Sequence, residues 1–137
     1  MKEATATTMS IRSTSYVKIA SQDWSSKLGE LGQIVEGLDD ISQCIEIILT
    51  TPKGSVPHRL DFGCDIYKFV DSPPAAASSY IVSEVYNALS KWEPRITVES
   101  VQVVPNTFAH YTIQVNWSPN EDYVATSYQT ISQEVVV

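Results

Sequence analysis

The sequence predicts an α+β fold in which two main helices pack on a small antiparallel sheet. Up to Trp92 the apolar residues repeat at helical spacing, whereas after Arg95 they alternate every second residue, as in strands that bury one face. Pro94 separates the two patterns, because proline forces the residue before it out of helical geometry. The helices should therefore precede the sheet, with the corner Glu93-Pro94-Arg95 between them. This corner can serve as a structural clamp within the chain or as a docking point for a partner.

Length and charge narrow the class of protein. The chain has 137 residues, 43% of them hydrophobic and 18% charged, which suits one globular domain with its own core. Its net charge of -7 argues against nucleic acid as a partner, because phosphate binding needs clustered Lys and Arg, and neither occurs after Arg95. No apolar run reaches the ~18 residues of a membrane span, and no signal peptide is evident. We therefore expect cytoplasmic synthesis and neither nucleic acid nor membrane as a partner.

The first helix should run from Asp39 to about Thr50. Asp39 and Asp40 lie in its first turn, where carboxylates complement the helix dipole, and Pro52 with Gly54 should end it. Its apolar stripe comprises Leu38, Ile41, Cys44, Ile45, Ile48 and Leu49.

The second helix should open at Ser72-Pro73-Pro74, with Ser72 as the N-cap and a proline in the first turn. Pro94 requires it to end at Trp92 or Glu93. Its buried stripe comprises Ile81, Val85, Ala88, Leu89 and Trp92.

A hairpin should follow, with strands from Ile96 to Val104 and from Phe108 to Trp117. Ile96 and Val98 mark one face of the first strand, and Val101 and Val103 mark the other. The change of phase at Glu99-Ser100 predicts a β-bulge.

The predicted organisation is a flexible arm at residues 1–15, a single domain at 16–122 and a C-terminal strand extension at 123–137. Residues 16–20 could form an edge strand, and Gly29, Gly32 and Gly37 indicate turns. The extension contains no proline or lysine, the residues that normally protect an exposed edge strand. The extension either pairs with a strand of a partner or forms a third strand wholly inside its own sheet.

No pattern in the sequence indicates catalysis, a cofactor or a metal. Cys44 and Cys64 are isolated thiols, and His58 and His110 belong to no ligand signature. No pair among the candidate acids can be brought together from spacing alone; these are Asp61, Asp65, Glu84 and Glu93. We therefore predict no catalytic residue, no cofactor, no metal ligand and a protein that is not an enzyme.

Five short motifs occur in an order that resembles the phage baseplate assembly protein W family, also called lysozyme-like. They are Val35-Glu36-Gly37-Leu38-Asp39-Asp40-Ile41, Ile48-Leu49-Thr50-Thr51-Pro52-Lys53-Gly54-Ser55, Asp61-Phe62-Gly63, Asp71-Ser72-Pro73 and Trp92-Glu93-Pro94-Arg95-Ile96. The resemblance covers roughly Trp24 to Trp117.

The resemblance implies a structural protein of the phage tail baseplate, made in the host cytoplasm and present in six copies around the tail axis. It would link the baseplate wedge to the first sheath ring and initiate the sheath. Glu93, Pro94 and Arg95 would dock wedge proteins, with tail tube or hub proteins as further candidate partners. The strand offered to the sheath protein would comprise Thr130, Ile131, Ser132, Gln133, Glu134, Val135, Val136 and Val137.

Two other functions are compatible with the sequence. The family's second name suggests a tail-associated murein hydrolase, although no catalytic pair of carboxylates can be identified in the sequence. A soluble α+β binding module unrelated to phage is the third reading.

Overall fold

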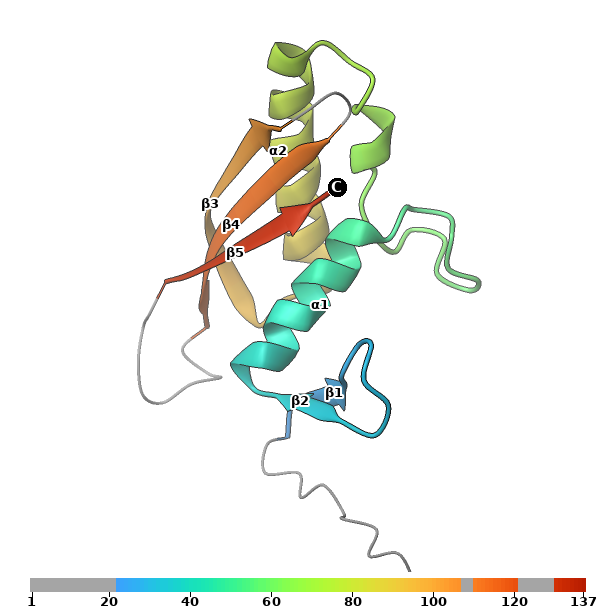
Figure 1. The fold of residues 1–137 in the computed structure, drawn as a ribbon, viewed down its shortest axis with the longest axis vertical. Helices are drawn as coiled ribbons and strands as arrows, with labels where there is room; N and C mark the ends of the chain where they lie inside the picture. Colours follow the sequence, from blue (N-terminus) through green and yellow to red (C-terminus); the bar gives the residue numbers. More distant parts are fainter. Residues whose placement is uncertain (1–21, 107–109, 121–129) are drawn as a thin grey trace, which may run out of the picture.

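The fold is known from a computed structural model that describes residues 22–106, 110–120 and 130–137 (Figure 1). The helices are α1, Leu38–Thr50, and α2, Pro74–Trp92, with a short 3-10 helix at Ile66–Lys68. A three-stranded antiparallel sheet has the order β3-β4-β5, with β3 at Ile96–Pro105, β4 at Tyr111–Pro119 and β5 at Ile131–Val136. The predicted α+β class is confirmed. The arm at 1–15 and the possible strand at 16–20 lie outside the described residues.

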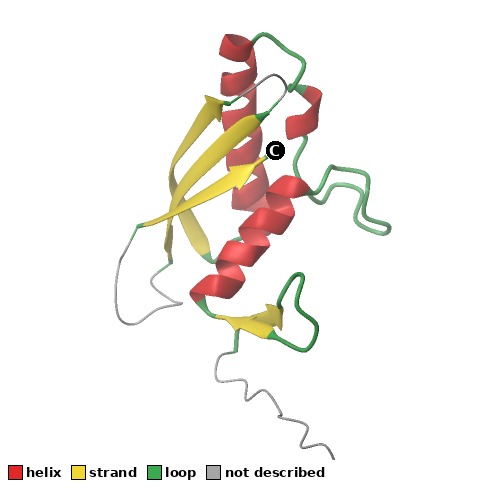
Figure 2. Ribbon diagram, in the orientation of Figure 1, coloured by secondary structure: helices red, strands yellow, loops and turns green. Residues whose placement is uncertain are grey.

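The two helices and the sheet share one hydrophobic core. Figure 2 shows α2 crossing behind the sheet, and α1 contacts β5. No helix in the described ranges has the length and apolar character of a membrane span. The largest fully buried side chains are Trp117, Ile45, Leu49, Ile66, Ile81, Leu89, Ile113, Val85, Val115 and Cys64.

Helix α1 begins one residue before the predicted start and ends where expected. Four residues of its predicted stripe are buried, but Leu38 is exposed and Cys44 is half-buried. The helix also buries a carboxylate, because Asp40 is only 3% exposed. A buried charge requires a partner, which the sequence did not reveal.

Helix α2 ends at Trp92 as predicted, but its start differs. The N-cap is Pro73, whose carbonyl oxygen accepts hydrogen bonds from the backbone N–H groups of Ala76 and Ala77. The prediction that Ser72 caps the helix was therefore wrong. Its backbone N–H instead donates to the carbonyl of Phe69 in the preceding turn, because the extended backbone of Pro73 sets the helix start one residue later.

The predicted bulge is present, as a register shift between Val98 and Ser100. Its effect on the strand faces was mispredicted. Val98 lies opposite Trp117, Val101 opposite Val115 and Val103 opposite Ile113, so the three valines share the core face. Because Glu99 is an extra residue in β3, Val101 and Val103 lie on the same face as Val98 and not on the opposite face.

A second, smaller sheet was not predicted. Strand β1, Trp24–Ser26, pairs antiparallel with β2, Ile34–Glu36. The intervening turn contains Gly29 and Gly32 with φ of 79° and 80°, so the predicted turns are confirmed. In Figure 1 this hairpin lies at the N-terminal end of α1, apart from the three-stranded sheet.

Candidate partner-binding site

The Glu93-Pro94-Arg95 corner is held by the end of α2 and the end of β4. The backbone N–H of Glu93 donates to the carbonyl of Leu89, which closes the last turn of the helix. Asn120 follows β4 and holds the corner's carbonyls: its backbone N–H donates to Arg95 O at 2.9 Å and its Nδ2 to Pro94 O at 2.7 Å. The chain therefore turns from helix to strand in a fixed geometry.

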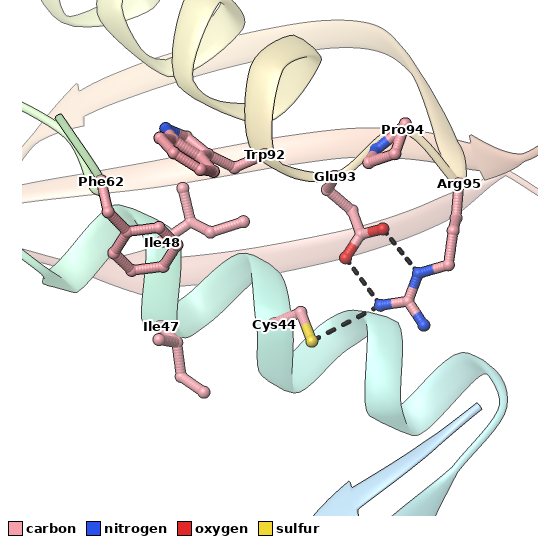
Figure 3. Close-up of a pocket in the computed structure, with 8 residues that line it drawn as sticks. All are labelled: Cys44, Ile47, Ile48, Phe62, Trp92, Glu93, Pro94 and Arg95. Carbon is pink, nitrogen blue, oxygen red and sulfur yellow. Dashed lines mark hydrogen bonds and ion pairs between the residues drawn. The ribbon is translucent and has the colours of Figure 1, made fainter. Parts of the chain in front are cut away.

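Arg95 points inward and binds carboxylates of its own chain. Its Nε and Nη2 donate to the two oxygens of Glu93 at 2.6 and 2.7 Å, which is a bidentate pair (Figure 3). Its Nη1 donates to Asp40 Oδ2 at 2.9 Å and lies 3.4 Å from Asp23 Oδ1. The side chain of Arg95 is 14% exposed and that of Glu93 is 4% exposed. Arg95 thus compensates the buried charge of Asp40 through Oδ2, whereas Asp40 Oδ1 is buried without a hydrogen-bond partner in the described part of the chain.

The electrostatics of this cluster keep the guanidinium charged. Its hydrogen bonds to Glu93 raise the pKa of Arg95, and the bond to Asp40 adds to the rise, although desolvation opposes it. Burial raises the pKa of the Cys44 thiol, and the neighbouring Asp40 and Glu93 carboxylates add to this effect. Cys44 is therefore a protonated thiol beside Arg95, whose Nη2 lies 3.5 Å from its sulfur.

A mainly apolar groove of about 350 Å³ lies beside the corner (Figure 3). The rings of Phe62 and Trp92 meet edge to face in it, with centroids 5.1 Å apart. It is lined by Cys44, Ile47, Ile48, Phe62, Trp92, Glu93, Pro94 and Arg95. The space is large enough for one or two apolar side chains.

The three predicted docking residues differ in how accessible they are to a partner. Pro94 is exposed, whereas Glu93 is buried and Arg95 is occupied by its own chain. Docking by this corner stays a prediction, since a single chain does not test it. Sequence reasoning missed the roles of Asp40 and Asp23, because 55 residues separate Asp40 from Arg95 and no local spacing links them.

The predicted sheath strand forms the edge of the three-stranded sheet. Tyr111 and Val137 exchange both backbone hydrogen bonds, at 3.0 and 3.1 Å, which fixes the alternation along β5. The backbone groups of Ser132, Glu134 and Val136 therefore point away from β4. In the described part of the chain, no strand pairs with this outer edge.

A side-chain contact also ties β5 to α1. Gln133 Nε2 donates to the carbonyl of Ser42 at 2.8 Å. Val135 is buried on the same side of the strand. The alternative that this segment is a third strand of its own sheet is thus correct for one of its two edges.

Two of the four candidate acids meet at one lysine: Lys53 Nζ lies 3.9 Å from Asp65 Oδ2 and 3.0 Å from Glu84 Oε2. The hydrogen bond from Lys91 lowers the pKa of Asp61, whereas a glycosidase's general acid needs a raised pKa. No group of three metal-ligating side chains gathers in these ranges. Each candidate acid has a cationic partner: Asp61 with Lys91, Asp65 with Lys68 and Lys53, Glu84 with Lys53, and Glu93 with Arg95.

Comparison with known proteins decides the family. Residues 35–118 match the family described as baseplate wedge protein gp25. This chain belongs to the gp25 baseplate wedge family. This chain is 34% identical over 91 residues to baseplate protein W of Escherichia phage P2. The match covers 66% of this chain and 79% of that protein. The resemblance found in the sequence is confirmed.

Two solved structures share the fold. A putative tail lysozyme from Geobacter sulfurreducens matches with a TM-score of 0.62 and 30% identity, over 72% of this chain and 87% of that one. A chain of the post-contracted pyocin R2 baseplate matches with a TM-score of 0.59 and 30% identity, over 71% of this chain and 98% of that one. The wedge protein is accordingly a structural baseplate component of a contractile phage tail.

Proposed function

We propose that the wedge protein links the baseplate wedge to the first sheath ring and initiates the sheath by strand pairing. The outer edge of β5 pairs with a strand of the sheath protein, and the groove beside the corner binds wedge proteins. Six copies stand around the tail axis, and tail tube or hub proteins are further candidate neighbours. The two surfaces make the chain a connector.

The observation that carries this proposal is the asymmetry between the two sheet edges. At the β3 edge, Tyr86 of α2 donates a hydrogen bond to the carbonyl of Val98 at 2.7 Å, next to the bulge. Both features disfavour a further strand at this end of β3. At the β5 edge, three residues with outward backbone groups also have exposed side chains: Ser132, Glu134 and Val136. Strand addition is therefore favoured at β5.

Glu134→Pro tests the strand pairing. Proline removes an N–H group that points outward, so the ladder to β4 stays intact while the outer edge loses a donor. We expect tails carrying this variant to assemble baseplates without sheath, as counted by electron microscopy. Glu134→Ala is the matched control, because it removes the same charge and keeps the N–H. Normal sheath on Glu134→Pro tails would refute strand pairing at β5.

A substitution in the groove tests wedge docking better than a substitution of Arg95. Removing the guanidinium would leave buried carboxylates without a cation, so an assembly defect would report misfolding as readily as lost docking. Ile47 lines the groove and is only half-buried. Its replacement leaves the ion pairs in place.

Ile47→Ser should lower incorporation of the wedge protein into baseplates while the isolated protein stays folded. Leu60→Ser is the matched control, because Leu60 is 67% exposed and does not line the groove. Incorporation would be measured by quantifying the protein in purified tails. Equal incorporation of both variants would contradict docking at the groove.

We propose that the function is structural and not enzymatic. The ion pairing of all four candidate acids supports this. Release of soluble fragments from purified peptidoglycan by the full chain, abolished by Asp61→Asn or Glu84→Gln, would establish the murein hydrolase instead.

A further inference from the structure

The β1–β2 hairpin exposes large apolar side chains. Trp24 is 48% exposed, Leu28 57% and Leu31 105%. We call these three residues the hairpin patch. Exposed apolar groups concentrated on one small element commonly mark an interaction surface. Figure 1 shows the hairpin at the N-terminal end of α1. The three side chains are not part of the hydrophobic core.

The hairpin backbone is fixed although its apolar side chains are exposed. Two strands of three residues do not hold together alone, so other contacts must order them. Gln43 of α1 supplies three: its Oε1 accepts from Leu28 N at 2.9 Å, and its Nε2 donates to Ser25 Oγ at 2.9 Å and Ser26 O at 2.8 Å. Polar contacts thus hold the tip in one shape before any partner binds, which lowers the entropic cost of binding.

The base of the hairpin is fixed as well. Asp23 O accepts a hydrogen bond from Gly37 N at 3.1 Å, and the Asp23 carboxylate lies 3.4 Å from the guanidinium of Arg95. The hairpin is therefore attached to the domain at both ends.

Charge around the patch indicates the kind of partner. Residues 22–39 contain four carboxylates and a single lysine, Lys27, which pairs with Glu30 at 2.5 Å. Asp23 pairs with Arg95, and the segment together with Arg95 still carries more negative than positive charge. A partner surface should thus combine an apolar recess with Lys or Arg at its rim. A second copy of this chain would bring the same acidic segment and a net charge of -7, which opposes self-association.

We propose that the hairpin patch is a third interaction surface, which inserts into an apolar recess with a basic rim on another protein of the tail. This goes beyond the proposed function, because neither the groove nor β5 takes part in it. Gln43 is a positioning residue for the surface, because it orders the backbone that carries Leu28.

The first test uses a photo-reactive amino acid, benzoylphenylalanine, at Leu31 of the full chain in assembled tails. We expect a cross-link to another tail protein, mapped by mass spectrometry to apolar residues flanked by Lys or Arg. The same probe at Leu60, another exposed leucine, should not reach that site. The proposal is overturned by no cross-link, by one to a second copy of the chain, or by one to residues 1–21 of the same chain.

The second test compares Leu28→Ser/Leu31→Ser with Leu60→Ser in competition with the unaltered chain. In tails made without sheath protein, we expect roughly tenfold lower incorporation of the double variant and none of this loss for the control. Because no sheath is present, this result is independent of strand pairing at β5. Equal incorporation, with both proteins unfolding at the same temperature, would overturn the proposal.

Gln43→Ala tests whether Gln43 orders the backbone of the hairpin. The amide protons of Lys27 and Leu28 should exchange faster with solvent, while those in the middle of β4 keep their protection. Incorporation should fall as well, although the variant removes no apolar side chain of the patch. Unchanged exchange at Leu28 would overturn the positioning role.

Discussion

The guanidinium of Arg95 contacts carboxylates from three separate segments of the chain, at Asp23, Asp40 and Glu93. The guanidinium stabilises the fold mainly because, without it, the buried carboxylates would have no compensating charge. The ion pairs themselves add less to the free energy of unfolding. Its removal should therefore cost more than the loss of its hydrogen bonds alone.

Arg95→Ala should lower the free energy of unfolding by roughly 3–5 kcal/mol, because Asp40 and Glu93 stay buried without a cation. Arg95→Lys should recover only part of this, since an ammonium cannot bind Glu93 through two parallel hydrogen bonds. Urea denaturation of the full chain measures both. Lys68→Ala, which removes an exposed pair with Asp65, is the control and should change stability by less than about 1 kcal/mol. A similar small loss for Arg95→Ala would show that the cluster is unimportant for folding.

Cys64 predicts a dependence of stability on alkaline pH. Burial raises the pKa of this thiol to about 11, from an ordinary value of 9.0. Between these values the folded state keeps a proton that the unfolded state releases, so stability is fully present below about pH 9 and falls toward pH 11. The slope from this one group is at most ~1.4 kcal/mol per pH unit.

Denaturation curves at intervals from pH 8 to 11 would test this, with Cys64→Ala as the comparison because tyrosine and lysine also titrate there. We expect the difference in unfolding free energy between the two proteins to shrink as the pH rises. A difference independent of pH would contradict the raised pKa.

At the scale of elements, the loop between α1 and the 3-10 helix depends on one glycine. Gly63 has φ of 103°, and a Cβ atom there would lie 2.1 Å from the carbonyl oxygen of Thr51. That oxygen also accepts the hydrogen bond from Cys64 N at 2.9 Å, so it cannot move freely. The loop closes only when residue 63 lacks a side chain.

Gly63→Ala should therefore destabilise the protein by several times the ~1 kcal/mol expected for Gly54→Ala. Gly54 has φ of 86° and nothing within 4 Å of its added Cβ, so it shows the backbone cost alone. Thermal unfolding of both variants measures the difference. Equal losses would mean that the contact with Thr51 is relieved by a small shift.

Elements defined by local periodicity were predictable, and elements defined by distant contacts were not. Helices α1 and α2 and the β3–β4 hairpin follow from apolar spacing within each segment. The β1–β2 hairpin was missed because its strands have three residues each and depend on a glutamine 15 to 18 residues away. In the candidate site, the corner was predictable from Pro94, but its partner Asp40 was not, because the two meet only through the tertiary fold.

At the scale of the whole molecule, β5 belongs to the fold as well as to the proposed interface. Val135 is buried, and Gln133 reaches Ser42 in α1. Truncation after Thr130 should thus lower the free energy of unfolding by about 3 kcal/mol or more, because it removes the buried Val135, at about 1.5–3 kcal/mol, and the partly buried Ile131 and Val137. Urea denaturation would measure this. Unchanged stability would show that the strand is only loosely attached, and truncation would then suffice to test sheath initiation.

The alternation along β5 has a mechanical consequence for any strand that pairs with it. Outward backbone groups recur only at every second residue, from Ser132 to Val136. A paired strand can therefore shift along this edge only in steps of two residues, about 7 Å, and each step breaks several hydrogen bonds together. Such a pairing resists sliding under tension, and the two strands can occupy only a few discrete registers.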